Sequence, residues 1–185
     1  HLPRYNFVTR VQSGPIGRPM RLGKDEVVVC EGIHALNDDI AAYCPDAFRL
    51  YISARSIVVD NDGREVFKGT WMRLLRRLVR DSNFRGTPAA ATLDMWANVR
   101  RGEKRFISPF KERANLMFDS SFPCEVSILK NYAAPLLAAV PEGAERYAEI
   151  RSILPALERF ETIDPALLAP ESMLREFIGG GVYSY

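Results

Sequence analysis

The chain has 185 residues, of which 47% are hydrophobic and 26% are charged, and its formal net charge at pH 7 is +2. Both charge signs are well represented, so the composition excludes an intrinsically disordered chain and is typical of a globular protein. The length suits one domain with a substantial core, and we expect residues 1–185 to form it.

Cysteine and histidine usage argues against a zinc protein. Cys30, Cys44 and Cys124 show no C-x-x-C spacing, and the sequence holds only two histidines. Cys30 lies in an apolar run, so we predict a buried free thiol in a reducing compartment. No stretch of about 18 apolar residues and no signal peptide is present, so we expect a cytoplasmic protein with no membrane partner.

The first predicted element is the short extended segment "PRYNFVTR" at residues 3–10. Tyr5 and Phe7 are two residues apart and share one side of an extended chain, which provides a platform for stacking a flat base. Arg10 has donors for hydrogen bonds to a base or a sugar. The commoner alternative is an aromatic pair that fills the core.

The run "GRPMRLGKDE" at residues 17–26 looks like a phosphate-binding loop but departs from one in three ways. Five residues separate Gly17 from Gly23, where G-x-x-x-x-G-K-[ST] needs four, and Asp25 replaces the hydroxyl residue. The run also precedes a predicted strand, whereas a P-loop follows one. We therefore predict a connecting loop.

Residues 27–30, "VVVC", are wholly apolar and predict a strand buried on both faces, as in a parallel sheet. Glu31 follows at the carboxyl end, where ligands bind in such sheets, and Gly32 allows close approach. Glu31 is therefore a candidate for a carboxylate beside a phosphate-bound Mg²⁺. Equally open is a carboxylate that caps a helix in "EGIHALNDDI". His34, as a single histidine, is weak support for acid–base chemistry.

Two further strands are predicted at "FRLYIS", residues 48–53, and at "LMFDSSF", residues 116–122. Helical stretches lie between them, so strands and helices alternate along the chain. This order predicts an α/β domain with a parallel sheet. The segment "DNDGRE", residues 60–65, is a predicted turn-rich loop.

The clearest helix is predicted over residues 71–83. Its apolar residues fall at i, i+3, i+4, i+7 and i+8 and form one face: Trp71, Leu74, Leu75, Leu78 and Val79. Arginines with the same spacing form another face: Arg73, Arg76, Arg77 and Arg80. Like charges so spaced repel each other unless anions or acidic side chains neutralise them.

Two explanations of this arginine row remain open. Guanidinium groups bind phosphate oxygens in pairs, and Arg77, Arg80 and Arg85 would converge if the chain turns back at Gly86. The alternative is a solvated basic face that pairs with Asp81 and other acids.

Three more helices are predicted. Residues 89–100 direct Leu93, Trp96 and Ala97 inward. Residues 144–160 carry an apolar stripe with an expected kink at Pro155. Residues 171–181, "ESMLREFIGGG", form a short helix that glycines end.

Taken in order, three of these motifs resemble the uridine kinase branch of the phosphoribulokinase/uridine kinase family. The family's P-x-Y-D-F segment, its strand ending in E-G-[IL] and its R-R-x-x-R-D-x-x-x-R-G lid have counterparts in "PRYNF", "VVVCEGI" and "RRLVRDSNFRG". The later part of the chain, from "MWANVRRGEKRF" to "LREFIGG", is similar to a bacterial subgroup in which the kinase follows a region similar to part of threonyl-tRNA synthetase. The resemblance spans nearly the whole chain.

The resemblance implies a P-loop kinase-type α/β fold, in which helices flank a parallel sheet. The family's P-loop strand and helix lie upstream of its P-x-Y-D-F segment, so we expect an incomplete fold here and an isolated chain without activity. The implied parent protein is an ATP- and Mg²⁺-dependent kinase that phosphorylates the 5′-hydroxyl of a uridine- or cytidine-like nucleoside. The lid would cover about residues 71–105, and a C-terminal helical segment about residues 125–185.

On the nucleoside side, the resemblance assigns substrate binding to Tyr5, Asn6, Phe7 and Arg10. Asn6 stands where the family usually has aspartate, and Arg10 where uridine–cytidine kinases usually have histidine. Specificity for uridine therefore does not follow from the resemblance.

On the phosphate side, the resemblance places Glu31 near the magnesium ion as a catalytic and metal-binding residue. Arg77 and Arg80 would be catalytic, and together with Arg85 they would hold the phosphates of ATP as the lid closes. Expected partners are thus a nucleoside and ATP, with a homo-oligomer left open.

The rival hypothesis is a degenerate kinase-like basic module that binds RNA or a protein partner. Its contact residues would be Arg73, Arg76, Arg80, Arg100 and Arg101.

Overall fold

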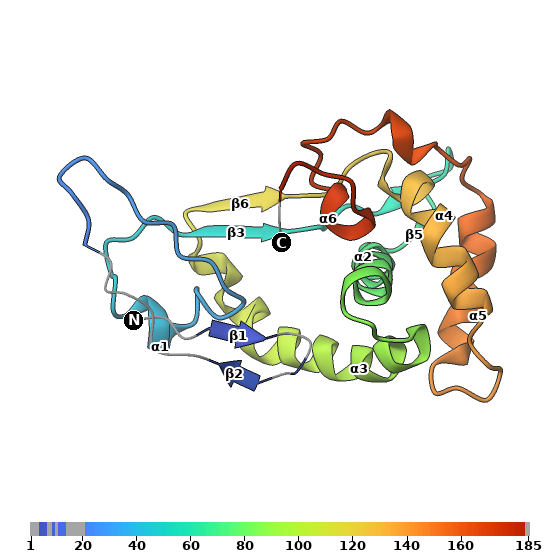
Figure 1. Cartoon of the computed structure of the whole chain (residues 1–185), viewed down its shortest axis with the longest axis horizontal. Coiled ribbons are helices and arrows are strands. Elements are labelled where there is room, and N and C mark those ends of the chain that lie inside the picture. The colour runs from blue at the N-terminus through green and yellow to red at the C-terminus, as the bar shows by residue number, and fades with distance from the viewer. Residues whose placement is uncertain (1–3, 7–8, 10, 14–20, 184–185) are drawn as a thin grey trace.

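The computed structural model describes residues 4–6, 9, 11–13 and 21–183 and shows a mixed α/β protein (Figure 1). Strands β3 (Leu50–Ser53) and β6 (Leu116–Asp119) pair in parallel, with Leu50 opposite Leu116 and Ser53 opposite Asp119. Both strands were predicted, and their parallel pairing confirms the α/β class. The sequence predicted a larger parallel sheet. Among the described residues, β3 and β6 are the only strands that pair in parallel.

Two antiparallel pairs accompany it. Strand β1 (Arg4–Asn6) pairs with β2 (Val11–Ser13), and β4 (Val58–Val59) pairs with β5 (Glu65–Phe67). The predicted turn-rich loop at residues 60–65 joins β4 to β5, where Gly63 has a φ of 77°. A left-handed conformation of this kind favours glycine, because other residues carry a Cβ that clashes.

The prediction of a buried strand at residues 27–30 is wrong. The segment is irregular and exposed, and residues Val27 and Val29 are 88% and 87% exposed. An apolar run becomes a strand only when a neighbouring strand supplies its hydrogen bonds, and no strand pairs with this run in the described part of the chain. Cys30 is exposed as well, so its prediction as a buried thiol is also wrong.

Residues 21–36 extend as a loop away from the body of helices (Figure 1). The short helix α1 (Asp38–Ala41) follows, and the Asn37 side chain caps it by accepting a hydrogen bond from the Asp39 N–H at 3.1 Å. The helix expected after residue 31 therefore exists, but Asn37 caps it instead of Glu31.

Helix α2 (Gly69–Phe84) confirms the clearest sequence prediction and lies at the centre of the helical part. Leu74, Leu75, Leu78 and Val79 are fully buried, as their spacing predicted. The helix packs against α3 (Ala89–Phe106), α4 (Glu125–Ala138) and α6 (Arg175–Ile178). Helix α3 runs six residues beyond its predicted end at Arg100 and leads into the 3₁₀ helix η1 (Ser108–Arg113).

The C-terminal third of the chain is helical, as predicted. Helix α5 (Tyr147–Glu158) packs beside α4 (Figure 1), and Pro155 lies within it. The 3₁₀ helix η2 (Pro165–Leu167) and the predicted short helix α6 follow. Helix α6 ends at Gly179, whose φ of 84° breaks the helical path.

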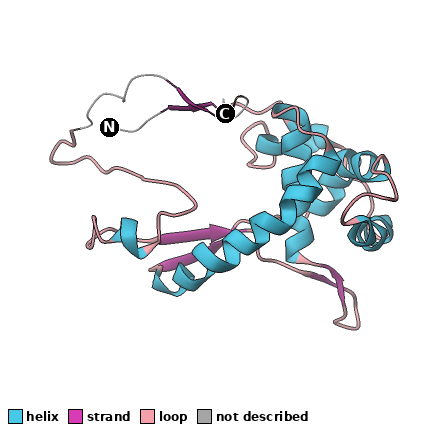
Figure 2. Ribbon diagram, turned by 90° about the horizontal axis from the view of Figure 1, so that it is seen from below, coloured by secondary structure: helices cyan, strands magenta, loops and turns pink. Residues whose placement is uncertain are grey.

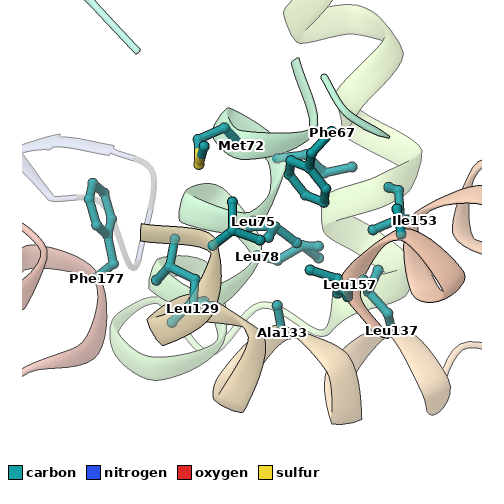
Figure 3. Close-up of a cluster of buried hydrophobic side chains, with 14 of the residues drawn as sticks. Phe67, Met72, Leu75, Leu78, Leu129, Ala133, Leu137, Ile153, Leu157 and Phe177 are labelled. Carbon is teal, nitrogen blue, oxygen red and sulfur yellow. The ribbon is translucent and has the colours of Figure 1, made fainter. Parts of the chain in front are cut away.

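The core lies where α2, α4 and α5 meet (Figure 3). Leu75 and Leu78 of α2 pack with Leu129 and Leu137 of α4 and with Leu157 of α5. Figure 2 shows the strand pair β3–β6 beside this helical body. Among the described residues no helix is both long and apolar enough to cross a membrane.

Candidate functional site

The arginine row of α2 is held by carboxylates from the helices around it. Its ion pairs reach α3, α4 and α6 as well as α2 itself; the acidic partners are Glu103, Glu125, Glu176 and Asp81. The pairing with Asp81 and other acids agrees with the alternative prediction for this row. The arginine side chains are partly buried, so the row is less solvated than that prediction expected.

Arg76 makes the most buried of these pairs. Its Nη2 donates to Glu125 Oε2 at 2.6 Å and to the Ser120 carbonyl at 2.7 Å, and its Nε donates to Glu125 Oε1. The Glu125 side chain is 0% exposed and that of Arg76 is 13% exposed. The Phe122 N–H also donates to Glu125, at 3.2 Å. Glu125 thus joins α2 to the start of α4.

Asp81 brings two of the predicted phosphate-binding arginines together. Its carboxylate is buried and lies 3.2 Å from Arg77 Nε and 3.0 Å from Arg85 Nη1. The Thr92 hydroxyl donates to it at 3.2 Å. The helix ends at Phe84 and Gly86 has a φ of 59°, so the chain turns back where the sequence predicted.

Arg80 points to a different partner. Its Nη1 pairs with Glu176 of α6, and its guanidinium carbon lies 5.6 Å from the centre of the Phe177 ring. Within the described residues the buried Nε atoms of Arg77 and Arg80 have no hydrogen-bond acceptor; Arg77 Nε is close to Asp81, but without hydrogen-bond geometry. Buried donors in this state call for an acceptor.

The remaining predicted residues lie apart from the row. Tyr5 and Asn6 belong to β1, opposite Gln12 and Val11, whereas Phe7 and Arg10 fall outside the described residues. Glu31 is exposed and has no hydrogen-bond or ion-pair partner among the residues that the structure describes. The roles assigned to these residues stay predictions.

His34 and the possible metal ligands can also be placed. The ring of His34 meets that of Phe106 edge-on, with centroids 6.3 Å apart, at the end of α3. In residues 4–6, 9, 11–13 and 21–183, no group of three or more His, Cys, Asp or Glu side chains is arranged to hold a metal ion.

Asp119 is a feature that the sequence interpretation missed. It ends β6, at the edge where ligands bind in parallel sheets. Its carboxylate accepts hydrogen bonds from the Arg55 N–H at 3.0 Å, the Ser121 hydroxyl at 2.7 Å, the Ser121 N–H at 3.0 Å and the Ser56 hydroxyl at 2.9 Å. Partial burial pushes its pKa upward, but these four bonds outweigh burial and hold the pKa well below its usual range. The sequence signal was an aspartate followed by two serines at a strand end.

This pKa gives a pH-dependent prediction for Asp119→Asn. Because the folded-state pKa is lowered, the charge of Asp119 stabilises the fold fully above its unfolded pKa of about 3.9. We expect the difference in unfolding free energy between the native chain and the variant to be constant above about pH 5 and to shrink as the pH falls below 4. Urea unfolding at several pH values measures it. If the difference in unfolding free energy does not change with pH, the negative charge of Asp119 does not contribute to stability.

The sequence model of the phosphoribulokinase / uridine kinase family matches residues 1–126. The matched part contains β3, β6, the arginine row and Asp119, and it ends just inside α4. No curated protein and no solved structure matches the chain significantly.

Proposed function

Because the chain belongs to the phosphoribulokinase/uridine kinase family, we propose that it is the nucleoside-binding and lid portion of an ATP-dependent nucleoside kinase. The reaction would transfer the terminal phosphoryl group of ATP to the 5′-hydroxyl of a uridine- or cytidine-like nucleoside. The bacterial subgroup, the cytoplasmic location and the single-domain boundaries belong to this proposal.

The proposal rests on the ion-pair and hydrogen-bond partners of Arg77, Arg80 and Arg85, the proposed lid arginines. Arg77 and Arg85 share one buried carboxylate, and the buried Nε atoms of Arg77 and Arg80 lack an acceptor among the described residues. Phosphate oxygens are the acceptors that guanidinium groups bind best. An ATP phosphate chain would therefore satisfy donors that the carboxylates leave unsatisfied.

The residues present fit ATP through their donors. Arg77, Arg80 and Arg85 would orient its phosphates and balance the negative charge that spreads over the transferred group. Magnesium, bridging the phosphates, supplies further charge neutralisation. The resemblance to the family would assign this magnesium to Glu31, but Glu31 lies on an exposed loop apart from the arginine row, so we assign it no step of the reaction. The sequence holds no G-x-x-x-x-G-K-[ST] run, so we propose that the isolated chain is inactive.

The basic-module hypothesis receives less support. Four of its five arginines, Arg73, Arg76, Arg80 and Arg100, are bound by carboxylates. A strand of RNA would have to displace these carboxylates from all four. A nucleic-acid module should also lose affinity steeply as salt rises and tolerate many sequences.

A direct assay tests the kinase proposal. The gene-encoded protein that carries this chain is incubated with Mg²⁺-ATP and either uridine or cytidine, and nucleoside monophosphate is measured by chromatography. We expect monophosphate formation that depends on both substrates. If the protein hydrolyses ATP at a rate that no nucleoside changes, and forms no monophosphate, the proposal is wrong.

Tyr5→Ala tests the nucleoside side of the proposal. We expect the nucleoside KM to rise by the equivalent of roughly 1–3 kcal/mol, the contribution of one base stacked on an aromatic ring, with the KM for ATP unchanged. Steady-state kinetics with each substrate varied in turn measures both constants. Tyr43→Ala, at an exposed tyrosine, is the control. A loss of affinity for both substrates would assign Tyr5 a structural role.

A further inference from the structure

A shallow cavity with a basic lining, open to solvent, lies where the carboxyl end of β3, the start of α2 and the end of α3 meet. Its volume is about 410 Å³, which is in the range of small-molecule sites. Five cationic side chains line it: Arg55, Lys68, Arg73, Arg100 and Lys111. Two carboxylates, Glu65 and Glu103, line it as well, so its lining carries a formal charge of +3. A second cavity of about 300 Å³ shares Arg100, Glu103 and Ser108 with it.

The positive charge of this cavity is only partly neutralised. Glu103 pairs with two guanidinium groups, those of Arg73 and Arg100, and Lys111 pairs with Glu112 at 3.4 Å. Neither Arg55 nor Lys68 has a carboxylate partner in the part of the chain that the structure describes: Arg55 Nη1 lies 3.5 Å from the Met117 sulfur, and Lys68 Nζ lies over the Trp71 ring. Cations gathered in one cavity repel each other, so an anion bound there would be stabilised.

The backbone at the start of α2 adds to the positive electrostatic potential of this cavity. Gly69 and Thr70 open α2 at the cavity, and no side chain caps the helix there. The first N–H groups of a helix lack internal partners and carry partial positive charge, which favours phosphate oxygens. A Cβ at residue 69 would lie 3.0 Å from the Ser56 carbonyl oxygen and 3.1 Å from that of Arg55. Glycine therefore allows the start of α2 to approach the chain that leaves β3.

From the cavity, its unneutralised cations and the uncapped start of α2, we propose a binding site for the phosphate groups of a small phosphorylated molecule. Ser53, Thr70 and Ser108 also line it, and each carries a hydroxyl group that can act as an uncharged donor. Arg77, Arg80 and Arg85 do not line it. The site is thus distinct from the lid arginines and goes beyond the proposed kinase function.

Titration of tripolyphosphate into the full chain, followed by calorimetry, tests this site. We expect saturable binding with one ligand per chain. The double variant Arg55→Gln/Lys68→Gln removes the two cations that have no carboxylate partner and breaks no ion pair, so it should fold normally and bind roughly tenfold more weakly or worse. The double variant Lys24→Gln/Arg151→Gln removes the same two kinds of charge at exposed positions outside the cavity. It is the matched control and should bind as the native chain does.

Three results would overturn the proposal. The first is no saturable binding. The second is binding that Arg77→Gln removes and the double variant leaves intact, which would place the ligand on the lid arginines and support the kinase proposal alone. The third is a loss of equal size in Arg55→Gln/Lys68→Gln and in Lys24→Gln/Arg151→Gln, together with competition by single-stranded RNA. Binding would then follow total charge, as on a nucleic-acid surface.

Discussion

Glu125→Ala is expected to lower the free energy of unfolding by about 3–5 kcal/mol, the usual cost of removing one partner from a buried ion pair. The Glu125 carboxylate is fully buried and receives two bonds from Arg76 and one from the Phe122 N–H. Its loss leaves the Arg76 guanidinium buried with only Ser120 as an acceptor. Urea unfolding of the purified chain measures the change. Glu161→Ala, at an exposed glutamate in a loop, is the control and should shift stability by less than about 0.5 kcal/mol.

A double variant separates the unpaired charge from the lost contact. In Arg76→Met/Glu125→Leu both charges are gone and apolar groups of similar length fill the space. We expect this variant to be more stable than Glu125→Ala, because no charge remains buried without a partner. If it is less stable than the single variant, the pair itself, and not the unpaired guanidinium, accounts for the loss.

The spacing of apolar residues along the chain was enough to predict the main helices. The spacing of Leu74, Leu75, Leu78 and Val79 reports a face that must be buried, and all four are buried. Helix periodicity works because it depends on residues a few positions apart. The same holds for the turn at Gly86 and the end of α6 at Gly179, where a positive φ favours glycine.

Partners far apart in the sequence could not be predicted in this way. The sequence indicated that the arginine row needs acids or anions, but not which ones. The chosen acids lie 30, 49 and 96 residues from Arg73, Arg76 and Arg80. Which acid reaches which arginine depends on how α3, α4 and α6 pack on α2, and no local pattern encodes this.

The prediction of a buried strand at residues 27–30 was wrong for a related reason. Its three valines and cysteine satisfy the pattern of a strand in the middle of a sheet, but the pattern does not supply the neighbouring strand. The pair β3–β6 leaves apolar side chains such as Ile52 and Phe118 half exposed. The site prediction that depended on Glu31 lying at a sheet edge therefore rests on the resemblance to the family.

The C-terminal helices contribute contacts to the proposed lid from outside the part of the chain that the family match covers. The match ends at residue 126, whereas Glu176, which binds Arg80, and Phe177, which lies against it, come from α6. Helix α6 thus holds one of the proposed phosphate-binding arginines in place.

Arg80→Ala in the gene-encoded protein is expected to lower kcat by about one to two orders of magnitude, the equivalent of one charge-assisted contact of about 1.5–3 kcal/mol to the transferred phosphate. The fold should persist, since the Arg80–Glu176 pair is partly exposed and such pairs contribute about 1 kcal/mol or less. Steady-state kinetics with uridine and ATP gives the rate, and circular dichroism confirms the fold.

Glu176→Gln is the control that decides what Arg80 does. It breaks the same ion pair but leaves the guanidinium available to phosphate. If Arg80 acts on ATP, Glu176→Gln should retain near-normal kcat, because the arginine no longer has to leave a carboxylate before it binds phosphate. If both variants lose activity to the same extent, the activity depends on the ion pair between Arg80 and Glu176. Arg80 would then have no direct role in binding the transferred phosphate. Unchanged activity in Arg80→Ala would have the same consequence.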